Sequence, residues 1–540
     1  MTDSQRLFDR LDEYFAKRMA ADNIPGMALA ITDRRRTLHM SAMGLSDISS
    51  GARVTVNTSF QIGSISKSFT SIVLLKLMEL GRLDIHAPLK EYLPWFEVKS
   101  KYPPITLHHL MTHTAGIPIG SECTTAAESE IWSLRYLETG APPGEFFHYS
   151  NTGYKALGLV IEAVTGRPCS EAVSRYIVEP LEMKRTQVSI TNDVFEESAV
   201  GYGWLHDDRP AGRKARLAPA TRFESISADG SISSVPGDMA AYIRMILHRG
   251  EGPNGRIISE ESFELLTGEH VAPLDRRRGE FYGYALNVEK DDGHKCIWHT
   301  GGMVGFTSAM YIDMDLGVGA IALANSLSGV DEMPTHALHV IRAAEENKSL
   351  PKPVIHLHAY VPENHRQFAG VYRSCSATLE INAEDGFLVA KLSDGQFVLE
   401  GLREDNFLLE HPSFFLYPLR FTRTDGEVSG LVHGPDTYVL EPCARKPDLS
   451  AIPEDWPGFV GHYRSHNPWQ PSIRVVLREG QLVLVDPSAG EEPMQPLPDG
   501  SFRIGADSRS PERIRFDMVI GSKAYRAILS EGYLYRSFTP

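Results

Sequence analysis

One helix, apolar on nearly every side, limits the folds available to this chain most strongly. The segment 68–80 ends at Gly81, and glycine commonly caps helix C-termini. Its large apolar side chains occupy nearly every face: Phe69, Ile72, Val73, Leu74, Leu75, Leu77, Met78 and Leu80. A helix that is hydrophobic all round has to be enclosed by other elements. We therefore expect a buried helix with Ser64 and Lys67 at its N-terminal end.

Both ends of the first 350 residues are expected to contribute to one sheet. Short apolar runs predict strands at residues 27–32, 38–44, 297–300, 309–313 and 318–324. A four-residue apolar spacing predicts an amphipathic helix over 4–21, and a further helix is expected at about 333–346. Residues 84–260 have a mostly helical pattern with Pro/Gly-rich loops. The prediction is a discontinuous α/β domain over residues 1–350, into which a mostly helical region is inserted.

The sequence pattern changes after Pro351 and Pro353. Short alternating strands are separated by turn residues every eight to twelve positions or so, which is typical of small antiparallel barrels. This part also contains a repeat, because Phe368-x-Gly370-x-Tyr372-Arg373 recurs as Phe459-x-Gly461-x-Tyr463-Arg464. We predict two small antiparallel β-barrel domains, at 359–446 and 452–540.

Ser64 and Lys67 form a Ser-x-x-Lys pair, which places a hydroxyl and an amine on one face of a helix. The helix N-terminus offers N–H donors to developing negative charge. A serine hydroxyl is a poor nucleophile until a base takes its proton. Lys67 can be that base only if burial or neighbouring cations keep it neutral, and an exposed helix lysine is the structural alternative.

A second segment carries a phenol beside an amide. Tyr149 and Asn151 follow the loop signal Pro142-Pro143-Gly144, and in an extended segment both side chains point the same way. The phenol is suited to relaying a proton and the amide to holding a substrate carbonyl. An ordinary loop tripeptide is the alternative interpretation.

A third segment, His299-Thr300-Gly301-Gly302, follows a short predicted strand. Its glycines allow a substrate backbone to approach closely. A histidine packed at a strand edge is the alternative here.

The order of these three segments resembles the penicillin-recognising serine hydrolases, which include class C β-lactamases, D,D-carboxypeptidases, family VIII esterases and D-aminopeptidases. The resemblance covers about residues 5–345. It implies a multidomain α/β protein with a β-lactamase/transpeptidase-like catalytic domain, in which an antiparallel sheet is flanked by helices. The two barrels that follow resemble the D-aminopeptidase architecture.

The resemblance implies a role for each residue. Ser64 would attack the substrate carbonyl, Lys67 and Tyr149 would shuttle the proton, and either of the two could be the general base. The N–H groups of Ser64 and Gly302 would form the oxyanion hole. The remaining predicted site residues are His299, as a further catalytic group, and Asn151, Thr300 and Gly301, as substrate-binding groups.

His299 stands where the resembled family has a lysine. The replacement removes a permanent cation, which argues against recognition of a carboxylate such as that of a β-lactam. We therefore expect a peptidase, aminopeptidase or amidase that acts on small or D-residue peptides through an acyl-enzyme on Ser64. The alternatives are a carboxylesterase, a weak β-lactamase, or a catalytically silent homologue that binds a ligand.

Charge and motifs restrict the partners. The formal net charge of -15 disfavours nucleic acid and anionic membranes, and the basic runs 34–36 and 276–278 are short. Dinucleotide, Walker and zinc patterns are missing, so no cofactor or metal is expected. A small molecule or short peptide is the expected substrate, and self-association into a homo-oligomer is left open.

Two observations concern the setting of the protein. The cysteines are scattered, which indicates reduced thiols: Cys123, Cys169, Cys296, Cys375 and Cys443. Charged residues interrupt the segment 1–19, and no apolar run of about 18 residues follows, so we expect a cytoplasmic protein.

His109 and His113 are four residues apart, a spacing that could indicate a metal pair. No glutamate follows His109 as a zinc protease requires, so we expect a structural or loop-shaping role.

Overall fold

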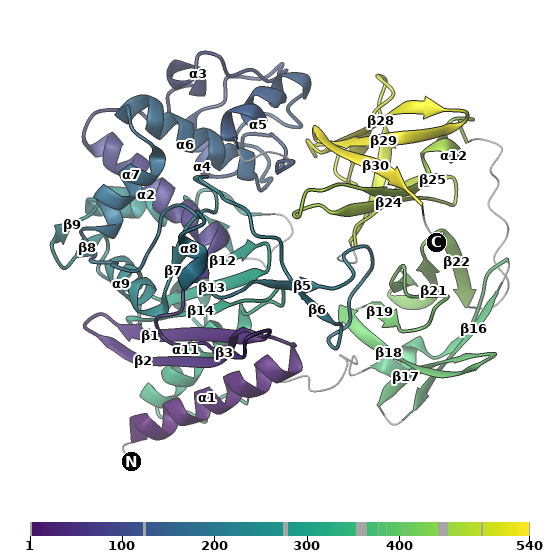
Figure 1. Cartoon of the computed structure of the whole chain (residues 1–540), viewed down its shortest axis with the longest axis horizontal. Helices are drawn as coiled ribbons and strands as arrows, with labels where there is room; N and C mark the ends of the chain where they lie inside the picture. Colours follow the sequence, from purple (N-terminus) through teal and green to yellow (C-terminus); the bar gives the residue numbers. More distant parts are fainter. Residues whose placement is uncertain are drawn as a thin grey trace. The chain divides into compact units, whose positions relative to one another are not determined.

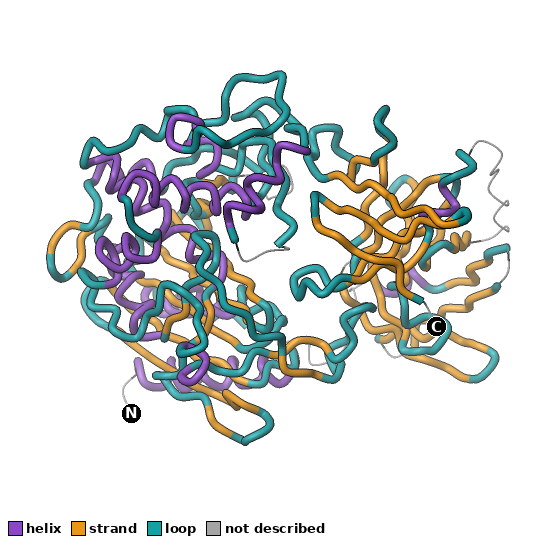
Figure 2. The backbone as a smooth tube through the Cα atoms, turned by 45° about the horizontal axis from the view of Figure 1, so that its top comes forward, coloured by secondary structure: helices purple, strands orange, loops and turns teal. Residues whose placement is uncertain are grey.

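The computed structural model describes residues 3–122, 126–273, 279–352, 364–375, 377–384, 386–403, 405–440, 452–487 and 490–538. The chain divides into two units (Figure 1). The first comprises Met1–Gly203 with Ala218–Ile355, and the second comprises Trp204–Leu217 with His356–Pro540. Nearly all helices belong to the first unit, and the second consists mainly of strands and loops (Figure 2).

The first unit is built on an eight-stranded sheet with the order β10-β11-β12-β13-β14-β1-β2-β3. In that order, its antiparallel strands are Phe281–Tyr282, Asn287–Asp291, His294–Met303, Phe306–Asp313, Val318–Ala324, Gly26–Asp33, Thr37–Asp47 and Ala52–Arg53. The two ends of the unit meet where β1 pairs with β14, with Met27 opposite Ala324. The predicted sheet shared by both ends is therefore confirmed.

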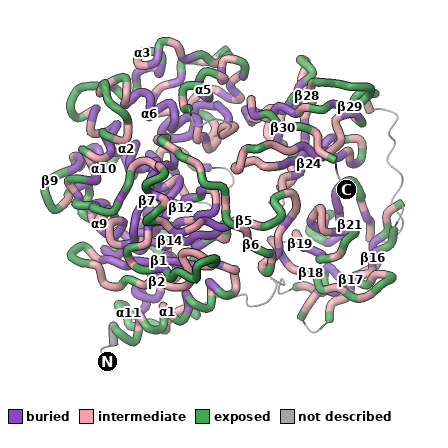
Figure 3. Tube along the Cα trace, in the orientation of Figure 1, coloured by how far each residue is buried: buried purple, intermediate pink, exposed green. Residues whose placement is uncertain are grey.

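Helices cover both faces of the central strands. On one face, α1 (Asp3–Ala21) and α11 (Glu332–Glu345) pack on alternate β1 residues such as Leu29. On the other face lies α9 (Pro236–Leu247), whose Arg244 donates to Thr32 Oγ1 at 3.0 Å. The central strands appear buried throughout in Figure 3. Burial on both faces explains why β1 and β14 are continuous apolar runs in the sequence.

The helix α2 (Ser66–Glu79) is buried at every position from Ser66 to Leu75, as its apolar faces predict. Apart from α6, the remaining helices and strands of this unit are short, because proline and glycine interrupt residues 84–260. The helices are α3 Leu89–Tyr92, α4 Leu107–Met111, α5 Ala127–Ser133, α6 Asn151–Thr165, α7 Cys169–Val173, α8 Val194–Glu197 and α10 Glu260–Leu266, with 3-10 turns at Gly63–Ile65 and Leu134–Tyr136 and a π-helix at Ser174–Val178. Short strand pairs are β4 Phe60–Gln61 with β7 Ser233–Ser234, β5 Tyr202–Trp204 with β6 Leu217–Pro219, and β8 Glu251–Gly252 with β9 Gly255–Arg256.

The second unit contains two closed antiparallel barrels of eight strands each, as predicted. The first barrel consists of β15 Gly370–Arg373, β16 Thr378–Glu384, β17 Phe387–Leu392, β18 Gly395–Arg403, β19 Asn406–Leu409, β20 Leu419–Thr424, β21 Glu427–His433 and β22 Asp436–Leu440. The second consists of β23 Gly461–Arg464, β24 Ser472–Arg478, β25 Gln481–Val485, β26 Glu491–Pro496, β27 Phe502–Ile504, β28 Arg513–Ile520, β29 Lys523–Leu529 and β30 Gly532–Ser537. Pairing of β15 with β22, and of β23 with β30, closes them.

The repeated sequence motif forms the same structure in both barrels. Each copy begins with one helical turn, His365–Phe368 or α12 (Trp456–Phe459), and continues into the first strand. The buried Tyr372 hydroxyl donates to the Phe368 carbonyl at 2.8 Å, and Tyr463 donates to the Phe459 carbonyl at 2.7 Å. The motif therefore joins the turn to the strand that opens each barrel.

The second unit also includes the segment 204–217, which comes from the middle of the chain. Arg464 pairs with Asp207 at 2.7 Å, and the Arg213 N–H donates to Glu400 at 2.6 Å. Both barrels therefore contact this segment.

Some predicted features lie outside the described residues, namely the basic run 276–278, Cys123 and Cys443. Cys169, Cys296 and Cys375 are free thiols. Among the helices that the structure describes, we find none that is both long and apolar enough to span a membrane.

Candidate active site

Ser64 and Lys67 lie together at the start of α2. Ser64 is in the 3-10 turn that runs directly into the helix, and Lys67 belongs to the first helical turn. Lys67 is fully buried, and its Nζ donates to Ser64 Oγ at 3.0 Å. The spacing of the two residues in the sequence therefore corresponds to direct contact of hydroxyl and amine.

Lys67 has a second acceptor, the main-chain carbonyl of Asp229, at 2.7 Å. The segment that carries this carbonyl is fixed to α2, because Thr70 Oγ1 donates to the Ala228 carbonyl at 2.7 Å. It is also packed on α6, where a side chain in place of Gly158 would collide with Ala228. A main-chain acceptor of this kind leaves no signal in the sequence, because every residue type carries a carbonyl.

Tyr149 stands beside this pair. Lys67 Nζ lies 5.1 Å from the centre of the Tyr149 ring, and the tilted imidazole of His113 lies against the same ring, 4.2 Å away between ring centres. The next residue, Ser150, is the N-cap of α6, and its hydroxyl accepts from the Gly153 N–H at 3.0 Å. Tyr149 is thus held immediately before a helix start.

Asn151 differs from the expectation. It is the first residue of α6 rather than part of an extended segment, so the alternation that we expected to align it with Tyr149 does not apply. The Ser150 cap and the apolar face of α6 favour the helix. Within the described part of the chain, the buried Asn151 Oδ1 has no hydrogen-bond partner.

A buried ionic cluster lies one turn further along α6. Lys155 pairs with Glu122 at 2.5 Å and with Glu130 at 2.6 Å. Burial, followed by the nearby Asp229 carboxylate, raises the pKa of Glu122 to about 7. Burial by itself lowers the pKa of Lys155, but Asp229, Glu122 and Glu130 together raise it above its usual value. The cluster therefore ties α6 to α5 and to the loop before it.

The glycine-containing end of β12 contacts the chain just before Ser64. A Cβ at Gly301 would lie 1.9 Å from the Ile62 carbonyl oxygen, and a Cβ at Gly63 would lie 2.6 Å from the Gly302 nitrogen. Ser308 Oγ on the neighbouring strand donates to the same Ile62 carbonyl at 2.8 Å. The backbone of Gly302 therefore lies next to Gly63, one residue before Ser64.

Along β12 the side chains alternate between buried and exposed. Thr300 and Gly302 are exposed, whereas His299 and Gly301 are buried. His299 Nδ1 lies 2.6 Å from the Thr300 carbonyl and Nε2 lies 3.1 Å from the Tyr282 hydroxyl. Both ring nitrogens of His299 thus contact protein groups.

The two histidines after Thr106 have different surroundings. His109 closes a capping box, in which its ring accepts from the Thr106 N–H at 3.1 Å. His113 lies beyond the end of α4, contacts Tyr149 and adopts a positive φ of 56°. The four-residue spacing does not bring the two rings onto one helical face, because α4 ends between them.

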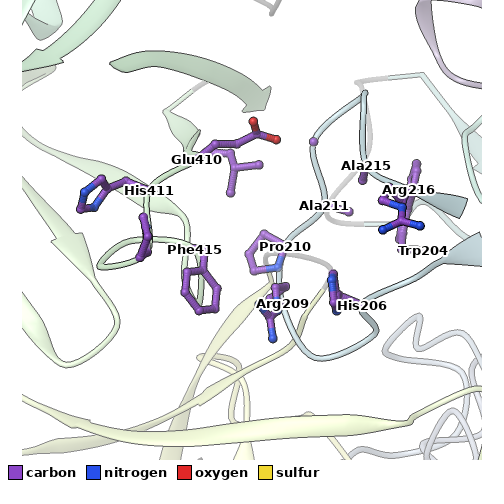
Figure 4. A pocket seen from close by; sticks show the side chains of 13 residues that line it. Trp204, His206, Arg209, Pro210, Ala211, Ala215, Arg216, Glu410, His411 and Phe415 are labelled. Atoms are coloured by element: carbon purple, nitrogen blue, oxygen red, sulfur yellow. The ribbon is translucent and has the colours of Figure 1, made fainter. Parts of the chain in front are cut away.

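A separate pocket of about 300 Å³ lies within the second unit, between the segment 204–217 and the chain after β19 (Figure 4). Its lining includes His206, Arg209 and Glu410. Arg209 stacks over the Phe415 ring at 4.4 Å and pairs with Asp208 at 2.8 Å. None of the predicted site residues lines this pocket.

Comparison with known proteins identifies the family to which this chain belongs. The family model described as beta-lactamase matches residues 11–345. Protein flp of Staphylococcus aureus (strain MW2) is 25% identical over 334 residues, which cover 60% of this chain and 63% of that protein. The chain thus spans less than two thirds of the length of that curated relative. Esterase EstB of Burkholderia gladioli is 24% identical over 369 residues, which cover 60% of this chain and 92% of that protein.

Among solved structures, the chain is similar to the octameric penicillin-binding protein homologue from Pyrococcus abyssi. The TM-score is 0.60 and the identity 26%, over 80% of this chain and 99% of that one. The chain belongs to the beta-lactamase family, whose members are serine hydrolases. The family resemblance noted in the sequence is therefore confirmed.

Proposed function

We propose that the protein is a serine hydrolase that cleaves amide or ester bonds through an acyl-enzyme on Ser64. The main support is the 3.0 Å contact between Lys67 Nζ and Ser64 Oγ, in a buried setting beside the Tyr149 ring. A hydroxyl with an adjacent amine and a nearby phenol has what nucleophilic catalysis requires, namely a nucleophile and a route for its proton.

The proposed reaction has two steps. Ser64 Oγ attacks the substrate carbonyl carbon while its proton passes to Lys67 or Tyr149, and the oxyanion accepts hydrogen bonds from the Ser64 and Gly302 N–H groups. The tetrahedral intermediate expels an amine or alcohol, which takes the proton. Water then attacks the acyl-enzyme, Ser64 regains its proton, and the acid is released.

The proposed substrates are small peptides or amides, including those with D-residues. The amide of Asn151, at the first position of α6, would hold a substrate carbonyl, and Thr300 and Gly301 precede Gly302 on β12. His299 binds Tyr282 and the Thr300 carbonyl through its two nitrogens. We infer that it does not replace the permanent cation of the family lysine, so β-lactams rank last among the substrates.

A carboxylesterase is the second candidate. The likeness to esterase EstB, which covers 92% of that protein, favours it. The same Ser64, Lys67 and Tyr149 would act, with an alcohol in place of the amine as leaving group.

The test compares the wild-type full chain with Ser64→Ala, and uses Ser129→Ala, an exposed serine on α5, as a matched control. A fluorophosphonate probe should label wild type and Ser129→Ala, and fail to label Ser64→Ala. Values of kcat/KM for D-alanyl p-nitroanilide, p-nitrophenyl butyrate and nitrocefin rank the substrate classes.

Normal labelling and turnover by Ser64→Ala would overturn the proposal. A dominant nitrocefin rate would overturn only the substrate ranking. Tight binding of the substrates without turnover by wild type would favour the silent ligand-binding alternative.

A further inference from the structure

One residue holds the backbone on both sides of Tyr149. The His148 N–H donates to the main-chain carbonyl of His113 at 2.8 Å, and the Ser150 N–H donates to the His113 ring nitrogen Nδ1 at 3.0 Å. His113 follows α4, which packs against α6. The residues that flank Tyr149 are therefore both bonded to a single residue more than thirty positions earlier in the chain.

The same residue also supports the Tyr149 ring. The His113 imidazole lies 4.2 Å from the Tyr149 ring, centre to centre, with 36° between the planes. Tyr154 and Tyr282 lie around the imidazole, each at 5.2 Å, and His113 is only 1% exposed. On the reacting side, Lys67 Nζ lies 5.1 Å from the centre of the Tyr149 ring.

The backbone of His113 is unusual for its residue type. Its φ of 56° lies in the left-handed region, which glycine and asparagine adopt more readily than most residues. This conformation lets the carbonyl bind His148 while the side chain reaches Ser150. Because Nδ1 accepts from an amide, the ring proton is on Nε2.

We propose that His113 is a positioning residue for Tyr149, which fixes the ring beside Lys67 through hydrogen bonds from the two flanking backbone N–H groups and one ring contact. The inference rests on the proposed role of Tyr149 in proton transfer. Small displacements of an acid–base group reduce the rate of the chemical step much more than they reduce substrate binding. In this role His113 acts through Tyr149 rather than on the reacting atoms.

The experiment uses four variants of the full chain. His113→Gly adopts the positive φ freely but has neither acceptor nor ring. His113→Asn also tolerates the positive φ, and its Oδ1 can accept from the Ser150 N–H. Tyr149→Phe removes the phenol, and the double variant His113→Gly/Tyr149→Phe completes the cycle. The measurements are kcat and KM for p-nitrophenyl butyrate and the rate of Ser64 labelling by a fluorophosphonate.

We expect His113→Gly to lower kcat and the labelling rate by about ten- to hundredfold while KM changes less than about threefold. His113→Asn should recover most of the loss, to within about fivefold of wild type, because it restores the acceptor. In the Tyr149→Phe background, His113→Gly should change the labelling rate by less than about twofold, since the phenol that it positions is absent.

Equal losses from His113→Gly in both backgrounds would overturn the inference, because they would show an effect that does not pass through Tyr149. If His113→Gly does not fold, His113→Asn replaces it, and the part of its loss that comes from the missing ring should disappear in the Tyr149→Phe background; a loss that persists there overturns the inference. Full activity of Tyr149→Phe would overturn the role of Tyr149 and this inference together. Loss in Tyr149→Phe with normal activity in His113→Gly would overturn this inference alone.

Discussion

The absence of two Cβ atoms allows β12 to lie against the turn that carries Ser64. The backbone of β12 touches the residues before Ser64 only because Gly301 and Gly63 lack a Cβ. The carbonyl that a Cβ on Gly301 would meet, that of Ile62, is itself fixed by Ser308. An added methyl group therefore has to displace the strand or the turn that carries Ser64.

We predict that Gly301→Ala lowers kcat/KM by about 100-fold, because the oxyanion donors move apart. Overpacking should also reduce the free energy of unfolding by about 1–3 kcal/mol. Steady-state kinetics with p-nitrophenyl butyrate and urea denaturation measure the two effects.

The control is Gly237→Ala on α9, where the added Cβ would meet its nearest atom, Met40 Sδ, at an ordinary 3.8 Å. Gly237→Ala should leave kcat/KM and the free energy of unfolding near their wild-type values. Wild-type activity in Gly301→Ala would contradict the close approach of β12 to the turn.

Among the site residues, the sequence predicts those that act through side-chain chemistry and regular spacing. Ser64 and Lys67 are three positions apart in a helical pattern, and the structure places them in contact. The Asp229 carbonyl and the His113 contacts could not be predicted, because both depend on segments far apart in the sequence that meet only in the folded chain.

At the scale of elements, a repeated turn and strand opens each barrel. The buried Tyr372 and Tyr463 hydroxyls satisfy the carbonyls of Phe368 and Phe459. Burial raises the pKa of Tyr463 to about 12, so its hydroxyl remains a donor at neutral pH. The repeat visible in the sequence thus has a specific hydrogen bond as its physical cause.

We predict that Tyr372→Phe reduces the free energy of unfolding of the barrel unit by about 1–3 kcal/mol, since a buried carbonyl loses its donor. Urea denaturation of the full chain, followed by circular dichroism, measures the change. Tyr525→Phe, at a residue 38% exposed, is the matched control and should be close to neutral. An equal loss in both variants would show that the Phe368 bond has no special contribution.

Element boundaries were predicted less well than element types. The sheet strands, α1, α2, α11 and both barrels follow from apolar periodicity. The loop signal before Asn151 favours an extended segment there, but the Ser150 cap starts α6 at Asn151 instead. Local patterns therefore identified the elements, and capping determined where α6 begins.

At the scale of the whole molecule, histidines from distant segments form a cluster in the first unit. The His108 ring lies 5.4 Å from His86 and 5.5 Å from His270, and its Nδ1 lies 2.7 Å from the Tyr284 hydroxyl. Burial, followed by the neighbouring His270, His109 and His86, lowers the pKa of His108 to about 4. The pKa values of His109 and His270 are lowered too, in both cases mainly by burial.

A histidine with a lowered folded-state pKa binds fewer protons than in the unfolded chain. Its contribution to stability is complete above about pH 6.5 and is lost as the pH falls towards about 4. We predict that the urea midpoint of the first unit decreases between about pH 7 and about pH 5, and that His108→Gln makes this decrease smaller.

His206→Gln, at an exposed histidine of the second unit, is the control and should leave the pH dependence unchanged. Two results would contradict the role of the histidine cluster. One is a wild-type urea midpoint that stays constant between about pH 7 and about pH 5, and the other is an equal pH dependence of the midpoint in His108→Gln.

The amino-acid sequence by itself determined the family, the sheet shared by both ends of the first unit, the paired barrels and the Ser64–Lys67 pair, because each is encoded in periodicity or spacing along the chain. Only the tertiary structure decided that the segment 204–217 belongs with the barrels, that a main-chain carbonyl binds Lys67, and that His113 supports Tyr149. The physical reason is that these contacts join residues distant in the chain through backbone atoms and buried rings. Such contacts form only once the apolar core has brought their segments together.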